Sequence, residues 1–222
     1  MKRLTIGSLS LNLLSLLTSL FLIVYYRRLI KRFFVAPGYA RRFSIFEKHP
    51  VQPNDTVFLG DSITEWFPLD EIFPDIRIKN RGISGDTTDG VLRRLHQIIS
   101  GQPRRIFLEI GTNDIGFGHA PSQIVANYEA ILERIQIESP HSQVFVLSIL
   151  PRHHRFAAKI QAINKEFAAL AQKYDYLFID LFPHFANERD GLRTEFTNDN
   201  LHLLVNGYAQ LKTVIAPYIY GD

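Results

Sequence analysis

Two kinds of hydrophobic pattern alternate along most of the chain. Short runs of consecutive apolar residues are typical of parallel strands covered on both faces, and apolar residues repeated every three or four positions are typical of amphipathic helices. The predicted strands are residues 56–59, 76–78, 106–110, 144–150 and 176–179. The predicted helices lie around residues 91–98, 124–135, 156–170 and 207–218. This alternation predicts a three-layer α/β/α domain with a parallel sheet.

The N-terminal segment has a different pattern. Residues 4–26 carry no charged side chain, and a helix of this length would measure about 34 Å, enough to cross roughly 30 Å of hydrocarbon. The run ends in Tyr25 and Tyr26 followed by Arg27, without the small residues of a signal-peptide cleavage site. We therefore expect an uncleaved, single-pass transmembrane anchor. A buried or amphipathic helix of the domain is the alternative.

The chain is accordingly divided into three parts. Residues 1–32 are the predicted membrane anchor, residues 33–54 a juxtamembrane connector with a short helix near 39–48, and residues 55–222 the α/β domain. Basic residues flank the apolar run on both sides, with more of them after it. The positive-inside rule then favours a cytoplasmic position for the domain.

The charge distribution argues against a nucleic-acid partner. Six of the 25 Lys and Arg residues but none of the 22 Asp and Glu residues lie in 1–32, so the remaining chain has a net charge of −3. The pI of about 9.1 therefore reflects the N-terminal segment. The chain has no cysteine, which excludes disulfides, thiolate zinc sites and a cysteine nucleophile.

Candidate chemistry gathers after the predicted strands. Ligands of a parallel α/β sheet bind outside the carboxyl ends of its strands. The segments that follow the strands or precede the last helix, and that carry polar side chains or glycine, are 60–62, 80–86, 111–114, 151–154 and 199–202. We expect them to share one edge of the sheet.

These segments contain the groups that ester hydrolysis at a serine requires, which are a nucleophile, a base and an acceptor that fixes the tautomer of the base. Ser62 lies at a strand-to-helix turn, His202 is the candidate base, and Asp199 is close enough in sequence to reach its Nδ1. The plainer interpretations are a helix N-cap for the serine and a surface pair for the other two.

Donors for a tetrahedral oxyanion are also present. Gly85 offers a backbone N–H without a Cβ beside it, Asn113 offers a side-chain amide, and Ser62 offers its own N–H. Asn113 could instead be an ordinary turn residue.

Together the segments resemble the four sequence blocks of the SGNH (GDSL) hydrolase superfamily. The blocks occur in the family's order across about residues 55–208. They are Val-Phe-Leu-Gly-Asp-Ser at 57–62, the segment from Asn80 to Gly85 and Asp86, Gly-Thr-Asn-Asp at 111–114, and Asp-x-x-His at 199–202. The resemblance is strongest to the platelet-activating-factor acetylhydrolase-like and lysophospholipase/thioesterase-like branches. It implies a flavodoxin-like fold with a five-stranded parallel sheet.

The resemblance also implies roles for individual residues. Ser62 would be the nucleophile, with Asp199 and His202 completing the triad. The activity implied is hydrolysis of an acyl ester, short-chain or acetyl, of a small molecule, lipid or glycan, through an acyl-enzyme, with no cofactor and no metal.

The implied oxyanion hole consists of the Ser62 N–H, the Gly85 N–H and the Asn113 side chain. Gly82 is a rival for the glycine position. Gly85 is preferred because it directly precedes Asp86, as in the most similar branches.

Further residues near the predicted site are candidates for substrate binding, namely Trp66, Arg81 and Asp61. Trp66 could equally belong to the hydrophobic core. His153 and His154 could compete for the role of base, although neither has a carboxylate at a fixed short spacing.

Three other functions are compatible with these residues. One is an O-acyltransferase acting on envelope glycans, and another is a non-catalytic binding module on the same fold. The third is a metallohydrolase that binds a divalent cation through Asp61, Asp86, Asp114, Asp199 and His202.

Overall fold

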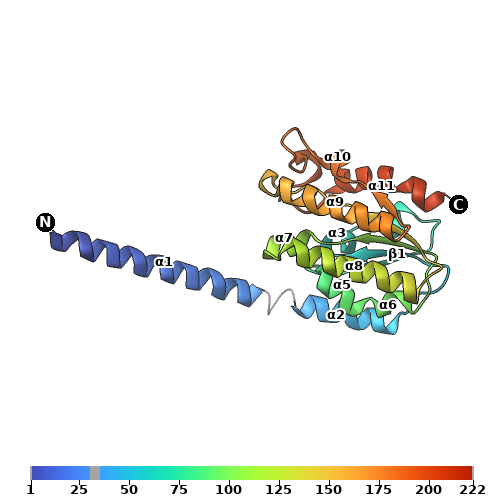
Figure 1. The fold of residues 1–222 in the computed structure, drawn as a ribbon, viewed down its shortest axis with the longest axis horizontal. Coiled ribbons are helices and arrows are strands. Elements are labelled where there is room, and N and C mark those ends of the chain that lie inside the picture. The colour runs from blue at the N-terminus through green and yellow to red at the C-terminus, as the bar shows by residue number, and fades with distance from the viewer. Residues whose placement is uncertain (1, 31–35, 222) are drawn as a thin grey trace. The chain divides into compact units, whose positions relative to one another are not determined.

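The computed structural model describes residues 2–30 and 36–221. By its internal contacts the chain divides into two units, Met1–Arg41 and Arg42–Asp222. The first unit contains α1 (Lys2–Ile30), and the second contains the sheet (Figure 1).

The predicted transmembrane span is not supported. Among the described residues, no helix combines the length and the apolarity that crossing a bilayer requires. Hydroxyl and amide side chains such as Asn12 and Thr18 dilute the apolar run of residues 4–26, and Thr18 bonds back to its own helix through Leu14 O at 2.8 Å. Residues 31–35, where the predicted anchor meets the connector, lie outside the described residues. The location of the domain relative to a membrane stays a prediction.

The sheet has five parallel strands in the order β2-β1-β3-β4-β5. Their bounds are β1 (Thr56–Gly60), β2 (Ile78–Gly82), β3 (Arg105–Glu109), β4 (Gln143–Leu147) and β5 (Leu177–Ile179). The predicted α/β class and parallel five-stranded sheet are confirmed. The position of the second strand is wrong, since it was expected at 76–78. β2 is an edge strand, so it does not need the continuous apolar run that marks an inner strand.

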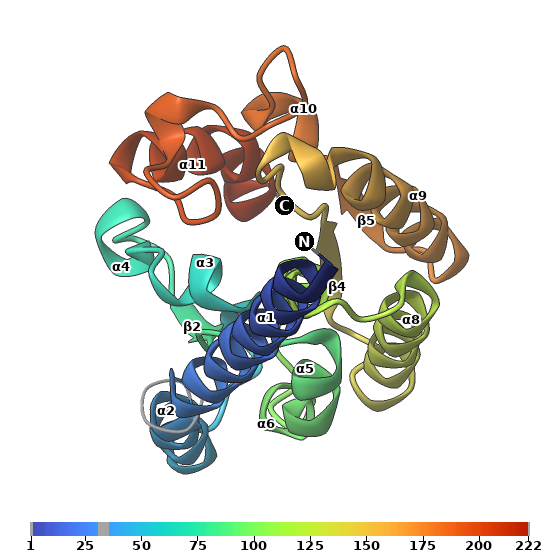
Figure 2. The same cartoon turned by 90° about the vertical axis from the view of Figure 1, so that its left-hand side faces the viewer.

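Helices cover both faces of the sheet, as Figure 2 shows with α5, α8 and α9 on one side and α3, α4 and α11 on the other. The helices of the second unit and the one that leads into it are α2 (Ala36–Lys48), α3 (Ser62–Glu65), α4 (Leu69–Ile72), α5 (Thr88–Arg94), α6 (His96–Ile99), α7 (Thr112–Phe117), α8 (Pro121–Glu138), α9 (Ala157–Lys173), α10 (Phe182–Phe185) and α11 (Val205–Tyr220). Short 3₁₀ helices occupy His154–Phe156 and Thr194–Phe196.

Alternate residues of each inner strand enter different hydrophobic clusters. In β1, Val57 and Leu59 belong to the cluster under α5, α8 and α9, whereas Phe58 belongs to the cluster under α3 and α11. Phe58 stacks on Phe107 at 4.7 Å between ring centroids, and Phe107 stacks on Phe145 at 4.4 Å. This two-sided burial fixes the register of the inner strands.

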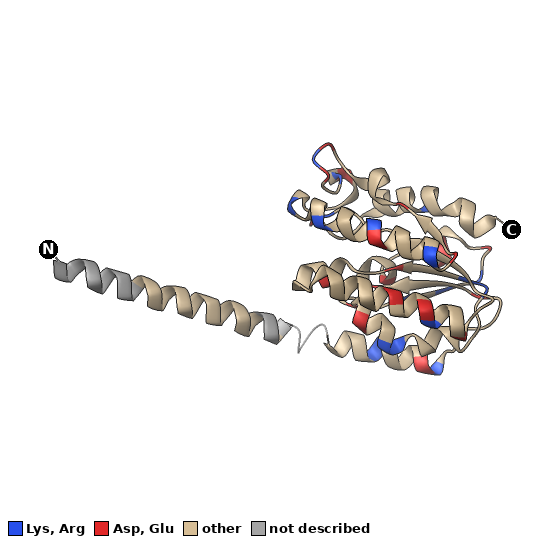
Figure 3. Cartoon of the chain, in the orientation of Figure 1, with Lys and Arg blue, Asp and Glu red and all other residues tan. Residues whose placement is uncertain are grey.

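The second half of α2 packs against the sheet domain. Phe46 is buried, Arg42 Nε donates to Gly82 O at 2.9 Å, and Gln97 Nε2 donates to Glu47 at 2.6 Å. The compact unit therefore begins at Arg42, within the segment predicted as a connector. Over its helices, acidic and basic side chains are interspersed (Figure 3).

Candidate active site

The nucleophile turn joins β1 to α3. The strand ends at Gly60, where a Cβ would lie 2.3 Å from Thr64 Oγ1, so only glycine fits. Asp61 caps the helix by accepting the Ile63 N–H at 3.0 Å. Ser62 follows as the first helical residue and is 5% exposed. The turn thus holds the Ser62 side chain at the carboxyl edge of the sheet.

The structure brings Ser62 together with His202 and Asp199. Ser62 Oγ lies 3.0 Å from His202 Nε2, and His202 Nδ1 lies 2.6 Å from Asp199 Oδ2. The serine and the histidine are 140 residues apart in sequence. The arrangement is that of a nucleophile, a base and a carboxylate that orients the base.

Asp199 is held by the loop that carries the histidine. Its Oδ1 accepts the backbone N–H of His202 at 2.8 Å, the N–H of Leu201 at 2.9 Å and the hydroxyl of Thr197 at 3.2 Å. Burial by itself raises the pKa of Asp199, but the hydrogen bonds from His202 and Leu201 outweigh it and lower the pKa below its ordinary value. Asp199 is therefore charged at neutral pH and is positioned to accept the Nδ1–H of His202.

The two candidate glycines of the oxyanion site differ in what their N–H groups do. Gly82 donates its N–H to Asn80 Oδ1 at 2.9 Å. Gly85 has φ +78°, a conformation that favours glycine. Within the described part of the chain, no hydrogen bond uses the N–H of Gly85 or of Ser62. These two donors are available to a ligand, whereas that of Gly82 is not.

Asn113 lies at the start of α7, after β3. Its Nδ2 donates to Asp86 O at 2.9 Å and faces Asp61 Oδ2 at 3.3 Å. The first bond orients the amide, and the second is long and more easily exchanged. Asn113 therefore has one N–H that could donate to a substrate oxygen in place of Asp61.

A pair of buried carboxyl groups lies beneath the nucleophile turn. Burial raises the pKa of Asp61 to about 7, against a smaller opposing effect of the Ile63 N–H. Glu109, at the end of β3, is buried, and neither of its carboxyl oxygens has a hydrogen-bond partner among the described atoms. Burial first, and then the charge of Asp61, raise the pKa of Glu109 well above its ordinary value. Two acids whose pKa values are raised by burial therefore lie next to the site.

A buried ion pair supports the loop that carries Gly85. Arg94 Nε lies 2.7 Å from Asp86 Oδ2, and the two side chains are 0% and 1% exposed. Arg94 Nη2 also donates to Gly60 O at 3.1 Å. One arginine thus ties the end of β1 to the loop after β2, and the carbonyl of the same Asp86 orients Asn113.

The three predicted substrate-binding residues have different surroundings. Trp66 is 53% exposed and lies against His202, with ring centroids 4.4 Å apart, so the alternative position in the hydrophobic core is excluded. Asp61 is fully buried and accepts a hydrogen bond from Asn113, the predicted oxyanion donor, at 3.3 Å.

Arg81 does not join the site. It belongs to β2, donates to His49 O at 2.7 Å and stacks on Phe46 at 4.6 Å. It was expected in a loop because the second strand was placed too early in the sequence. Since β2 extends to Gly82, the Arg81 side chain packs against the end of α2 and the residue that follows it.

The alternative chemistries find less support in the geometry. His153 and His154 are exposed, with their rings 4.2 Å apart, and the hydrogen-bond partner of Ser62 Oγ is His202.

The carboxylates proposed as metal ligands each have a protein partner. Asp86 pairs with Arg94, and Asp114 binds the backbone and hydroxyl of Thr88 at 3.0 and 2.8 Å. In the described ranges, no three His, Asp or Glu side chains converge as a metal site would require.

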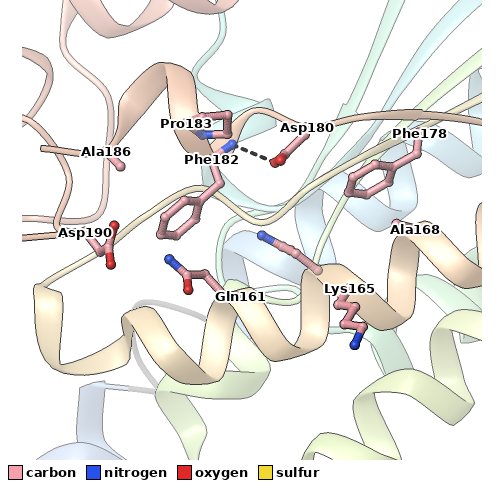
Figure 4. Close-up of a pocket in the computed structure, with 10 residues that line it drawn as sticks. Gln161, Lys165, Ala168, Phe178, Asp180, Phe182, Pro183, Ala186 and Asp190 are labelled. Atoms are coloured by element: carbon pink, nitrogen blue, oxygen red, sulfur yellow. Dashed lines mark hydrogen bonds between the residues drawn. The ribbon is translucent and has the colours of Figure 1, made fainter.

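A separate hollow of about 460 Å³ lies between α9, β5 and α10 (Figure 4). Asp180 accepts the Phe182 N–H at 3.1 Å there. Asn164, which also lines it, bonds Ile149 N and O at 2.8 and 2.9 Å. None of the triad residues lines this hollow, and its best-placed polar groups serve the fold.

Sequence reasoning missed Arg94 and Glu109 as components of the site, and it did not single out Arg152, whose Nη1 donates to Thr112 O beside Asn113 at 2.8 Å. Arg94 and Glu109 look like ordinary members of a helix and a strand, and no spacing rule connects them to Ser62. Arg152 stood in a segment that follows a strand, and its position there was the available signal.

Comparisons with known proteins agree with this geometry. The model of the GDSL-like lipase/acylhydrolase family matches residues 58–210. Platelet-activating factor acetylhydrolase IB subunit alpha1 of Pongo abelii is 32% identical over 165 residues, which cover 70% of this chain and 71% of that protein. The human protein of the same name is 30% identical over 164 residues, with 69% and 70% covered.

Solved structures with similar folds include proteins with related names. A Streptococcus pneumonia protein named for platelet activating factor superposes with a TM-score of 0.81 at 31% identity, covering 89% of this chain and 99% of that one. A GDSL-like lipase from Bacteroides thetaiotaomicron superposes with a TM-score of 0.72 at 23% identity, covering 82% and 97%. The second likeness shows a shared fold.

Proposed function

This chain belongs to the GDSL-like lipase/acylhydrolase family, and we propose that it is a serine esterase that forms an acyl-enzyme on Ser62. The observation that carries the proposal is the hydrogen-bonded series Ser62–His202–Asp199, with distances of 3.0 and 2.6 Å. Ester hydrolysis follows from family membership. The acyl-enzyme, the residue roles and the acyl group are the proposed parts.

In the first half-reaction, Ser62 Oγ attacks the ester carbonyl while His202 Nε2 takes the hydroxyl proton. Asp199 holds the N–H of the other ring nitrogen and stabilises the imidazolium that forms. The tetrahedral intermediate collapses when the C–O bond to the alcohol breaks and His202 returns the proton to that oxygen. Water then repeats the sequence on the acyl-serine, releasing the acid and regenerating Ser62.

The oxyanion of each tetrahedral intermediate accepts hydrogen bonds from the N–H groups of Ser62 and Gly85. The third donor is the Asn113 amide, whose N–H leaves Asp61 for the developing charge. These donors are fixed before the reaction by the nucleophile turn, the positive φ of Gly85 and the bond from Asn113 to Asp86. Preorganisation of this kind lowers the barrier most where the charge develops.

The acyl group we propose is short, with acetyl as the leading candidate. The relatives at about 30% identity are named as acetylhydrolases, and the similarity covers about 70% of each chain. Ser62 is only 5% exposed in its turn, which favours a small acyl group over a long chain.

A chain-length series of p-nitrophenyl esters, from acetate to laurate, tests the proposal. We expect the highest kcat/KM for acetate or propionate, and a fall in kcat of about 10⁴–10⁶ in Ser62→Ala. Ser100→Ala is the matched control, because Ser100 is an exposed serine whose hydroxyl, among the described residues, bonds His96 O of its own helix.

Labelling by a fluorophosphonate probe gives a second readout that does not depend on the substrate. The wild type and Ser100→Ala should be labelled, and Ser62→Ala should not. Near wild-type turnover by Ser62→Ala would exclude the acyl-enzyme.

Adding a sugar acceptor to the acetate assay separates hydrolysis from acyl transfer, since a transferase would yield the acetylated sugar in preference to free acetate.

A further inference from the structure

We propose that the basic segment Arg152–Arg155, which follows β4, binds an anionic group of the substrate, so that the esters this enzyme prefers carry a phosphate or a carboxylate. The inference rests on the proposed esterase function and extends it to a substrate class. The segment lies at the same edge of the sheet as Ser62, and the triad leaves its side chains unused.

The Arg152 guanidinium is held beside the catalytic residues. Its Nη1 donates at 2.8 Å to the carbonyl of Thr112, the residue before Asn113. Burial lowers the pKa of Arg152, and the negative charges of Asp61 and Asp199 oppose this lowering. Its backbone is fixed as well, because the Leu192 N–H donates to Arg152 O at 2.9 Å.

The guanidinium lacks a full set of partners. Arg152 Nε is buried without a hydrogen bond, and the group stacks on the Phe156 ring at 4.9 Å. Arg155 stacks on the same ring at 4.7 Å. Within the described ranges, neither arginine forms an ion pair with a carboxylate. Two guanidinium groups therefore contact one aromatic ring, and neither has an ion-pair partner among the described residues.

The nearby acids do not neutralise this charge. Asp199 is committed to His202 at 2.6 Å. Asp61 is fully buried and bonded to Ile63 N, and its pKa of about 7 leaves it partly protonated at neutral pH. Partial desolvation of the exposed His153 ring, followed by the charges of His154 and Arg155, lowers the pKa of His153, so the segment already disfavours a further positive charge.

The basic segment Arg152–Arg155 lies just before the start of α9. The positive end of a helix dipole favours acidic residues, yet the first turn of α9 has none, and three of the four residues that precede Phe156 are exposed His or Arg. A local arrangement that opposes stability in this way is expected at functional sites. A bound anion would satisfy the guanidinium groups and the helix end together.

Phosphate and carboxylate are the anions that a guanidinium fork recognises best. Three aryl acetates that differ only at the para position test the proposal: methyl 4-acetoxybenzoate, 4-acetoxybenzoate and 4-acetoxyphenyl phosphate. For each enzyme variant, kcat/KM is divided by the wild-type value for the same substrate, so that intrinsic reactivity cancels. The two anionic esters then distinguish a carboxylate from a phosphate preference.

We expect Arg155→Gln and Arg152→Gln each to lower kcat/KM for at least one anionic ester about tenfold more than for the methyl ester. Arg134→Gln is the matched control, because Arg134 is paired with Glu138 on α8. Arg155→Gln is the safer variant to fold, since the Arg155 side chain is exposed and its described side-chain contact is the Phe156 ring.

Calorimetric titration with phenyl phosphate tests the same site without turnover. Binding by the wild type and by Arg134→Gln, but not by the Arg152 and Arg155 variants, supports the proposal even if the esterase assays fail. Equal losses for neutral and anionic esters, or undiminished phenyl phosphate binding in both variants, overturn it. Fluorophosphonate labelling of Ser62 with no anion preference would retain the proposed function and reject only this inference.

Discussion

Trp66 lies over the imidazole of His202, with ring centroids 4.4 Å apart and the ring planes at 37°. It is the only tryptophan in the sequence, and about half of its surface is exposed. The neighbouring Phe67, by contrast, is buried against Phe58 and Tyr208. An exposed aromatic ring against His202, the proposed base, would favour the imidazolium that forms when Ser62 is deprotonated.

Removing this ring should slow the chemical step. We expect Trp66→Leu to lower kcat about two- to fivefold, from the loss of a cation–π contact at a partly exposed site. Trp66→Phe, which keeps an aromatic face, should retain most of the activity. Pre-steady-state measurement of acylation would show the effect directly, and an unchanged acylation rate in Trp66→Leu would argue against the contact having this role.

Replacing Asn113 should weaken oxyanion stabilisation without removing the nucleophile or the base. Asn113→Ala is expected to reduce kcat by about 10²–10³, with little change in KM, because the donor acts on charge that develops in the transition state.

Gly85→Val should be inactive, since the φ of +78° excludes a β-branched residue. A fully active Gly85→Val enzyme would move the backbone donor elsewhere.

Breaking the buried ion pair under the active-site loops should unfold the protein more readily. Arg94→Ala leaves Asp86 charged and buried, which typically costs about 3–5 kcal/mol of stability. Arg93→Ala is the matched control, because Arg93 is exposed and pairs with Asp89 on the surface, where such pairs contribute about 0–1 kcal/mol. Urea unfolding of the two variants measures the difference, and similar midpoints would contradict the structural role of Arg94.

The buried acids should make stability decrease as the pH rises. Asp61 has an ordinary pKa of 3.8 and a folded-state pKa of about 7, and that of Glu109 is also raised by burial. At a pH between the unfolded-state and the folded-state pKa of such an acid, the folded protein binds more protons than the unfolded protein. The unfolding free energy then falls by up to about 1.4 kcal/mol per pH unit for each acid. For Asp61 the contribution to stability is complete below about pH 4 and is lost as the pH rises through about 7.

Glu109→Gln isolates one of the two acids. The unfolding free energy of the wild type minus that of the variant, measured in urea from pH 5 to pH 8, should decrease with pH. A difference that stays constant or grows over this range would mean that Glu109 is ionised in the folded protein.

The N-terminal segment should be dispensable for the fold and for activity on water-soluble esters. The members of the two hydrophobic clusters lie at Val51 or later in the chain, and deletion of residues 1–32 also removes six basic side chains. The shortened protein should melt within a few degrees of the full chain. Large destabilisation would show that the segment packs on the domain, and fractionation of the full chain would test its predicted membrane location.

Local sequence patterns were sufficient for the fold class and for those parts of the site that depend on neighbouring residues. Apolar runs and helical periodicity predicted the three layers, because two-sided burial leaves a signal in the sequence itself. The Asp199–His202 pair could be expected for the same reason, since a spacing of three residues limits how far apart the two side chains can be. The edge strand β2 was misplaced because its partly exposed faces carry no such signal.

The tertiary structure decided everything that joins distant segments. Ser62 meets His202 across 140 residues, and Arg94 links Gly60 to Asp86, because the crossover helices bring separate strand ends to one edge of the sheet. Because β2 extends to Gly82, Arg81 packs against Phe46 and His49 rather than in the site. The N–H of Gly82 is likewise not available to a ligand, because it donates to Asn80 Oδ1. Residue type alone cannot determine such contacts, since they depend on how whole helices and strands pack against one another.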